Sequence, residues 1–123
     1  MRASGLITFG SHCLGPQPLL DIKSESQIKK EIFDSKKILE NNLGSEVAMF
    51  SYPGGRFNAR IRQLVKEAGY KLAVATSSGR KYPSDDVLAL KRIRIAESAA
   101  NLFIFRIQAS GFYTFIKERR DAD

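Results

Sequence analysis

Few residues of this sequence could do chemistry, and the first of them is a single histidine. His12 is the only histidine among the 123 residues, and it follows a short apolar run at residues 6–9. The histidine therefore ends a predicted strand and enters a loop, a place where proteins often carry functional groups. From position alone, a structural role is the commoner one and a metal ligand the alternative. The adjacent Cys13 could also ligate a metal, but a small buried hydrophobic residue is the expected role of a free cysteine.

A turn at residues 52–55 is the second candidate. Its sequence, Tyr52-Pro53-Gly54-Gly55, lies between a predicted strand and a predicted helix. Proline followed by two glycines predicts a tight turn that needs backbone conformations most residues avoid. Further along the chain, the neighbouring acidic residues Asp85 and Asp86 are predicted to be loop or helix-start residues.

The elements that must position these residues alternate between strands and helices. Apolar or alternating runs predict strands at residues 6–9, 47–50, 70–76 and 91–95. Apolar spacings of three and four predict helices at residues 28–43 and 59–68, and we favour a helix over an edge strand at 99–108. A polar loop is predicted at 77–86, and residues 112–120 fit either type of element. This order predicts parallel βαβ units.

The helix ends carry local signals. Ser24 and Gln27 have the spacing of a capping box, and Gly44 stands where a left-handed C-cap is expected. Asn58 is a suitable N-cap for the second helix, which Gly69 closes.

The composition is that of a soluble globular domain, with 43% apolar and 27% charged residues. No apolar run reaches the roughly 18 residues of a membrane span, and no apolar segment of a signal peptide follows the start. The single cysteine excludes an internal disulfide, and the cellular compartment stays undetermined.

The net charge of +7 permits nucleic-acid binding. However, the sequence shows no RNA-recognition motif, helix-turn-helix or metal finger, so no nucleic-acid partner is expected.

Three segments, in this order, resemble the polysaccharide deacetylase (NodB homology, carbohydrate esterase family 4) domain. Residues 9–19 are similar to the family's G-S-H-x-x-x-H-P segment, and residues 31–40 to the helix that follows it. Residues 50–58 are similar to the F-x-Y-P-x-G turn, and a typical L-V-K-E-A-G-Y segment follows at 64–70. The resemblance covers roughly residues 5–95 and corresponds to the carboxy-terminal part of the domain.

The resemblance implies a fold and a reaction. The fold would be α/β, a partial (β/α) barrel of the NodB type in which parallel strands alternate with helices. Residues 1–123 would form a single incomplete domain that lacks the N-terminal strands. The family's reaction is hydrolysis of a non-peptide carbon–nitrogen bond, removing N-acetyl groups from a glycan with a divalent, zinc-like metal. The ligands are an Asp-His-His set, and a second aspartate is the general base.

Carried over residue by residue, the resemblance assigns only part of this site. His12 matches the first metal histidine, but Pro16 occupies the second ligand position, and shifting the alignment by one places Gln17 there. No T-F-D-D-G segment or late L-x-H motif is present, so both aspartates and the general acid lack a match. A metal would be held weakly by one histidine.

The turn is the best-preserved part of the resemblance. It implies that Tyr52, Pro53 and Gly54 form the oxyanion turn, with the Gly54 N–H facing the acyl oxygen. Ser51 stands where many members have an arginine that orients the base. Tyr52, Arg56 and Phe57, with Tyr82, are the candidates to line a sugar groove, although each is also a plausible core or turn residue.

We therefore predict a polysaccharide deacetylase-like protein, a hydrolase by family, whose chain is truncated and inactive alone. The alternative is a non-catalytic remnant that binds carbohydrate or a protein partner. Missing first strands would leave sheet edges exposed, so an oligomer or a partner chain covering these edges is expected.

Overall fold

The computed structural model describes residues 6–76, 86–92 and 101–110, which fall into two units, Met1–Lys91 and Arg92–Asp123. In the first unit the elements follow one another as η2 Leu19–Asp21, α1 Glu25–Leu43, β1 Met49–Ser51, η3 Pro53–Gly55, α2 Ala59–Glu67, β2 Leu72–Ala75 and β3 Leu90–Lys91. The second unit contains α3, Leu102–Ala109, which confirms a helix in that region. Most of the polar loop predicted at 77–86, the end of the strand predicted at 91–95, and residues 112–120 lie outside the described residues.

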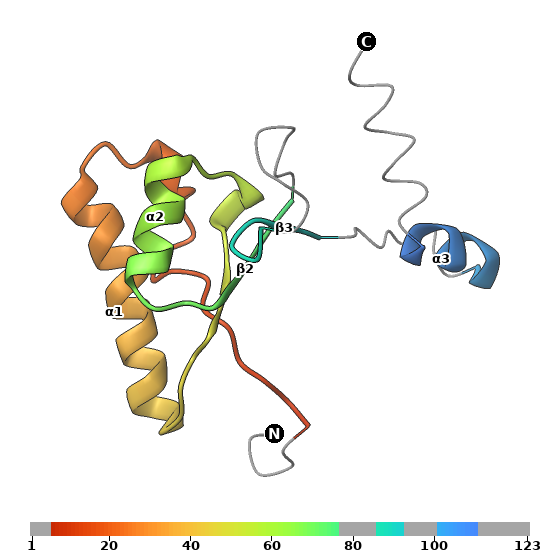
Figure 1. Ribbon diagram of the computed structural model, residues 1–123, viewed down its shortest axis with the longest axis horizontal. Helices are drawn as coiled ribbons and strands as arrows, with labels where there is room; N and C mark the ends of the chain where they lie inside the picture. The colour runs from red at the N-terminus through yellow and green to blue at the C-terminus, as the bar shows by residue number, and fades with distance from the viewer. Residues whose placement is uncertain (1–5, 77–85, 93–100, 111–123) are drawn as a thin grey trace. The chain divides into compact units, whose positions relative to one another are not determined.

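The strands form a parallel sheet in the order β1-β2-β3, which confirms the predicted parallel α/β architecture (Figure 1). Met49 pairs with Leu72, and Val74 pairs with Leu90. The chain before α1 joins the free side of β1 through one parallel bridge between Ser11 and Phe50. The Ser11 N–H donates to the Met49 carbonyl at 2.9 Å, and the Ser51 N–H donates to the Ser11 carbonyl at 2.8 Å.

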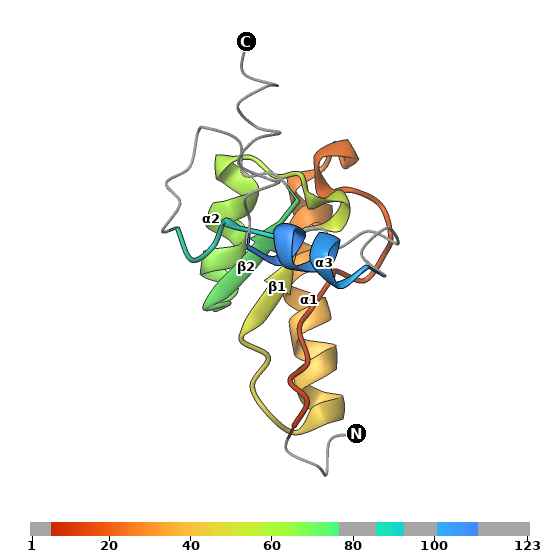
Figure 2. The same cartoon turned by 90° about the vertical axis from the view of Figure 1, so that its right-hand side faces the viewer.

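Helices α1 and α2 lie side by side on one face of the sheet, and the view of Figure 2 places β1 and β2 in front of them. Alternate strand residues point to opposite faces, and those on the helix side are buried: Phe50, Ala73 and Ala75. They pack with apolar residues of the helices, chiefly Ile32, Ile61, Leu64 and Val65. On the opposite face Met49, Leu72 and Val74 are only partly buried.

Four residues lie at the helix ends where the sequence places them, and three of them act there as predicted. Gly44 adopts the left-handed conformation at the end of α1, with φ 60° and ψ 29°. The Asn58 side chain accepts the Ile61 N–H at 2.8 Å and so caps α2, and Gly69 follows with φ 82°. The capping box was wrong, because Ser24 makes no side-chain cap bond and its hydroxyl instead pairs with that of Ser26 at 2.8 Å.

Two strand predictions need correction. Residues 6–9 form no regular strand and are not buried, since Leu6 is 89% exposed and only the bridge at Ser11 holds this segment to the sheet. The strand predicted at 47–50 begins later, at Met49. The reason lies in α1, where Glu40 accepts the Val47 N–H and Lys36 donates to the Val47 carbonyl, so side chains replace the ladder there.

Candidate functional site

His12 lies immediately beyond the bridge at Ser11, at the carboxyl end of the sheet. Its Nδ1 lies 2.6 Å from the carbonyl oxygen of Ser51, the last residue of β1. A carbonyl oxygen can only accept, so Nδ1 is the donor and carries the proton. In the neutral ring Nε2 then holds a lone pair, on a side chain that is exposed. A backbone carbonyl that fixes the tautomer in this way is the usual partner of a histidine that binds a metal.

The loop after His12 is held against α1 by a carboxylate. Glu31 accepts the N–H groups of Leu14 and Gly15, each at 2.9 Å. Pro16 and Gln17, the two candidates for the second ligand position, follow this anchor and are both exposed. Proline has no side-chain donor atom, so Pro16 cannot bind a metal.

Cys13 is unsuited to metal binding in this structure. Burial, followed by the negative charge of Glu31, raises the pKa of its thiol to about 12. The thiolate, which is the form that binds metals, is therefore a minor species at neutral pH. Cys13 also has a φ of 66°, which is unusual for a residue other than glycine and makes the backbone turn sharply after His12.

The turn at 52–55 follows β1 directly and so begins at the same sheet end as His12. The Gly55 N–H donates to the Tyr52 carbonyl at 2.8 Å and closes the turn as η3. Gly54 and Gly55 have φ values of 65° and 67°, the left-handed region that favours glycine. Gly55 is buried, and a Cβ there would overlap the side chain of Thr76, whereas Gly54 is exposed beside Pro18. Local geometry therefore requires both glycines.

The aromatic and basic residues around the turn divide into core and surface. Tyr52 is 1% exposed, and its hydroxyl donates to the Leu88 carbonyl at 2.9 Å, so its side chain belongs to the core. Phe57 is partly buried and stacks on Tyr52 with 4.4 Å between ring centroids. Arg56 is exposed and lies 3.5 Å from Asp21 in an open ion pair. Of the three, only Arg56 and Phe57 retain side-chain surface for a ligand, and Tyr82 lies outside the described residues.

An open groove of about 240 Å³ lies beside His12 on the sheet face opposite α1 and α2. Its walls come from residues 10–12 and 49–51, together with Leu72 and Val74. His12 thus borders a concavity near the carboxyl end of parallel strands, which is where α/β proteins place ligand sites.

Comparison with known proteins decides the family. The family model for polysaccharide deacetylase matches residues 1–73, more than half of the chain. The chain belongs to the polysaccharide deacetylase family. A curated relative, "Putative polysaccharide deacetylase YxkH" of Bacillus subtilis strain 168, is 29% identical over 90 residues. That alignment covers 73% of this chain but 32% of the relative, so the chain spans about a third of that protein's length.

Solved structures agree with this assignment. The deacetylase PplD of Streptococcus pyogenes, solved in complex with acetate, is 31% identical with a TM-score of 0.67, over 77% of this chain and 42% of that one. IcaB of Ammonifex degensii is 18% identical with a TM-score of 0.65, over 79% of this chain and 45% of its own, and supports the fold alone. The three-stranded parallel sheet with its helices is thus part of a NodB-type α/β fold, as predicted.

In the part of this deacetylase-family chain that the structure describes, the side chains do not make up a complete metal site. No group of three or more His, Cys, Asp or Glu side chains comes together in the described residues. His12 fits a ligand by itself, through Nε2, but a tetrahedral zinc site needs three or four protein ligands. No helix among the described residues is long and apolar enough to cross a membrane.

Two functional contacts were missed from the sequence. The Ser51 carbonyl holds the His12 ring, and Glu31 holds the loop that follows it. Neither contact has a local signal, since the partners are 39 and 17 residues apart. By contrast, the helical spacing already places Ser35 on the apolar stripe of this helix, where it is the one polar residue.

Proposed function

We propose that this chain forms one side of a polysaccharide deacetylase site. His12 supplies one ligand of a divalent metal, and the turn at 52–55 supplies a backbone donor to the acyl group. The observation that carries the proposal is the hydrogen bond between His12 Nδ1 and the Ser51 carbonyl, which leaves Nε2 available beside the groove. The reaction served is hydrolysis of N-acetyl groups on a glycan.

The proposed roles follow the geometry. A bound zinc-like metal would supply a hydroxide nucleophile at neutral pH. The turn would direct the Gly54 N–H toward the oxygen on which negative charge develops, since backbone donors are fixed in advance and stabilise such charge. Arg56 and Phe57 would contact the sugar, with Tyr52 behind them as a buried support.

We further propose that the chain alone does not turn over substrate. Its only histidine cannot complete an Asp-His-His set, and no segment of the sequence matches the family's T-F-D-D-G motif. Loss of a general base alone typically lowers the rate about 100- to 10,000-fold. The grouping of residues 1–123 into one incomplete domain, and the covering of its sheet edges by an oligomer or partner chain, remain predictions.

Zinc titration of the ¹⁵N-histidine-labelled chain tests the metal role. We expect zinc to shift Nε2 of His12 and His12→Gln to abolish this binding. Replacing Pro16 with histidine restores the family pattern and should tighten binding roughly 10-fold or more, because each imidazole is a full zinc ligand. Gln17→His is the matched control, and the expected order is Pro16→His above Gln17→His. Zinc binding that survives His12→Gln would refute the assignment.

Acetate titration and a turnover assay test the rest. Acetate should shift the amide signals of Gly54 and Gly55 more than those of α2, and perturbation spread over the surface would count against the acyl role. With zinc and N-acetylglucosamine oligomers, the chain should release no acetate above the zinc-only control. Release that depends on His12 would overturn the proposal of an inactive isolated chain. Oligomer binding that persists after His12→Gln and gives no zinc response would favour the carbohydrate-binding alternative.

A further inference from the structure

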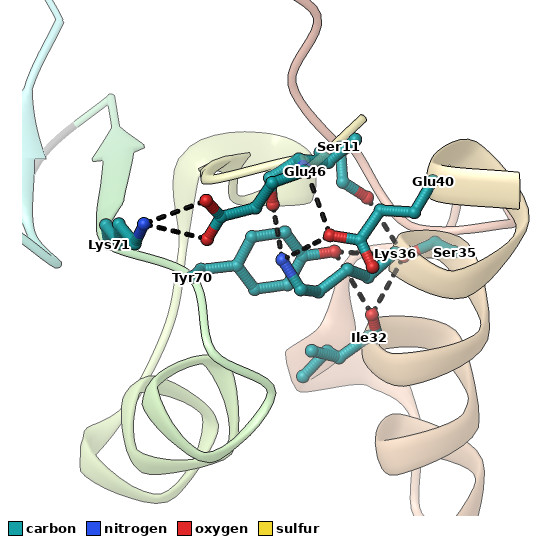
Figure 3. A network of polar contacts seen from close by, with 9 residues as sticks. Ser11, Ile32, Ser35, Lys36, Glu40, Glu46, Tyr70 and Lys71 are labelled. Atoms are coloured by element: carbon teal, nitrogen blue, oxygen red, sulfur yellow. Dashed lines mark hydrogen bonds and ion pairs between the residues drawn. The ribbon is translucent and has the colours of Figure 1, made fainter. Parts of the chain in front are cut away.

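Three buried hydroxyl groups meet on the side of the sheet that faces α1, and one of them belongs to the residue before His12 (Figure 3). They belong to Ser11, to Ser35 of α1 and to Tyr70, which are 1%, 2% and 4% exposed. Together we name them the hydroxyl cluster. Ser11 Oγ donates to Ser35 Oγ at 2.9 Å, and Ser35 Oγ donates to the Ile32 carbonyl at 2.9 Å. The Tyr70 hydroxyl donates to the same carbonyl at 3.2 Å and lies 3.5 Å from Ser35 Oγ.

Each hydroxyl of the cluster donates to a partner within the protein, so no hydroxyl hydrogen is left to donate to a ligand. Among the described residues, no buried side-chain nitrogen or oxygen lacks a partner. A buried hydroxyl without a partner costs free energy, so each member holds the next one in place. The cluster is therefore a mechanical link between α1 and residue 11.

The surrounding contacts make α1 a fixed support for this link. Lys36, one residue after Ser35, donates to the Val47 carbonyl and pairs with Glu40 at 2.9 Å. Glu40 in turn accepts the Val47 N–H at 2.9 Å, and the Lys36 ammonium lies 4.8 Å from the Tyr70 ring centre (Figure 3). Helix α1 is thereby tied to the chain that enters β1, independently of Ser11.

His12 needs such a link because its own attachment to the sheet is narrow. Among the described residues, the backbone of this segment pairs with β1 through the two hydrogen bonds of Ser11, and residues 6–10 form no regular ladder. These two bonds lie in the plane of the sheet, so by themselves they do not set the rotation of the segment about its own axis. Side chains alternate in extended chain, so Ser11 points to α1 while His12 points to the opposite face. A third attachment at Ser11 Oγ, off that axis, stops the twist.

We propose that the Ser11–Ser35–Tyr70 hydroxyl cluster is a positioning device for His12. It fixes the rotation of the 11–12 segment and so keeps Nδ1 against the Ser51 carbonyl. Ser11, Ser35 and Tyr70 are positioning residues, since their hydroxyls bond to one another and to the Ile32 carbonyl. The proposal rests on the proposed function for its purpose, but the orientation of the ring can be measured without any metal.

The experiment uses His12 as a unique ¹⁵N probe in the full chain. Long-range ¹H–¹⁵N correlation spectra report which ring nitrogen carries the proton. In the wild type we expect the Nδ1-protonated form alone. Ser35→Ala should produce a mixture with the Nε2-protonated form and weaken zinc binding about 10-fold, the lower end of the loss seen when groups around a ligand are removed. Tyr70→Phe should act in the same direction but less, because its contact with Ser35 is long.

Two further variants separate positioning from stability. Ser35→Thr keeps the hydroxyl and should restore the single tautomer. Asn58→Ala removes the α2 cap, away from His12, and should lower stability without changing the tautomer. If Ser35→Ala does not fold, Tyr70→Phe, which keeps the ring packed 5.0 Å from Phe50, carries the test.

The outcomes distinguish the two proposals. An unchanged tautomer in both Ser35→Ala and Tyr70→Phe overturns the positioning role, even if zinc binds His12. If Asn58→Ala changes the tautomer as much as Ser35→Ala does, the positioning role is overturned as well, because loss of stability alone would then account for the effect. Absence of zinc binding in the wild type, with the tautomer shift as expected, overturns the metal role and leaves the positioning intact.

Discussion

Replacement of Gly55 by alanine should destabilise this unit far more than the same change at Gly54. The two residues are neighbours with nearly equal φ values of 67° and 65°. Alanine in this left-handed region costs about 1–2 kcal/mol at either position, and about 0.4–1 kcal/mol of that is offset by the stiffer unfolded chain. Both terms cancel when the two variants are compared.

The remaining difference between the two variants is steric. A Cβ on Gly55 would overlap the Thr76 side chain, whereas a Cβ on Gly54 would touch Pro18 Cγ at 3.4 Å, an ordinary contact. Forcing extra atoms into a packed site typically costs about 1–3 kcal/mol. We therefore expect the free energy of unfolding of Gly55→Ala to lie about 1–3 kcal/mol below that of Gly54→Ala.

Urea unfolding followed by circular dichroism measures this difference, with the slope m required to be equal in both variants. Gly44→Ala is a further control, because Gly44 has a φ of 60° at the end of α1, remote from the turn. Equal destabilisation of Gly54→Ala and Gly55→Ala would refute the close approach of Gly55 to Thr76, and with it the described geometry of the turn.

Two other predictions concern charge and reactivity. Asp86 accepts two bonds from Arg62, at 2.6 and 2.7 Å, and these bonds, more than any other contact, hold the pKa of its carboxyl below the ordinary value. A carboxyl whose pKa is lowered by folding stabilises the fold at pH values above its ordinary pKa, and this stabilisation is lost as the pH falls through the folded-state pKa. Asp86→Asn should therefore lower the free energy of unfolding by about 1–2 kcal/mol at pH 7. The loss should be smaller in urea unfolding at pH 3, and an equal loss at both pH values would contradict the ion pair. For Cys13, whose thiol pKa is raised to about 12, disulfide exchange with an aromatic disulfide reagent at pH 8 should be at least about 100-fold slower than in urea-unfolded chain. Equal rates would contradict the burial of the thiol.

The sequence predicted the features of the fold that depend on local chemistry. The ends of α1 and α2 were correct at Gly44 and Asn58, because a left-handed glycine and an asparagine cap act within one turn of the helix. The start of β1 was wrong because Lys36 and Glu40, on another element, occupy the backbone of Val47. No local pattern could reveal that contact.

The candidate site shows the same division between local and distant effects. The histidine and the glycine turn were recognised from short motifs, and the structure places both at the carboxyl end of the sheet. The hold on His12 by Ser51, and the burial of Tyr52 through its bond to Leu88, depend on how distant segments pack. For that reason the sequence left Tyr52 open between a groove residue and a core residue, and the structure places its side chain in the core.

The protonation state of the His12 ring tests the central claim most directly. A long-range ¹H–¹⁵N spectrum of the full chain at a pH where the ring is neutral shows one histidine and needs no further assignment. The account predicts a proton on Nδ1 alone, held by the Ser51 carbonyl, with Nε2 free to bind a metal. A proton on Nε2, or the mixture of tautomers seen in free imidazole, would show that His12 is not held as a ligand, and the proposed deacetylase site would lose its support.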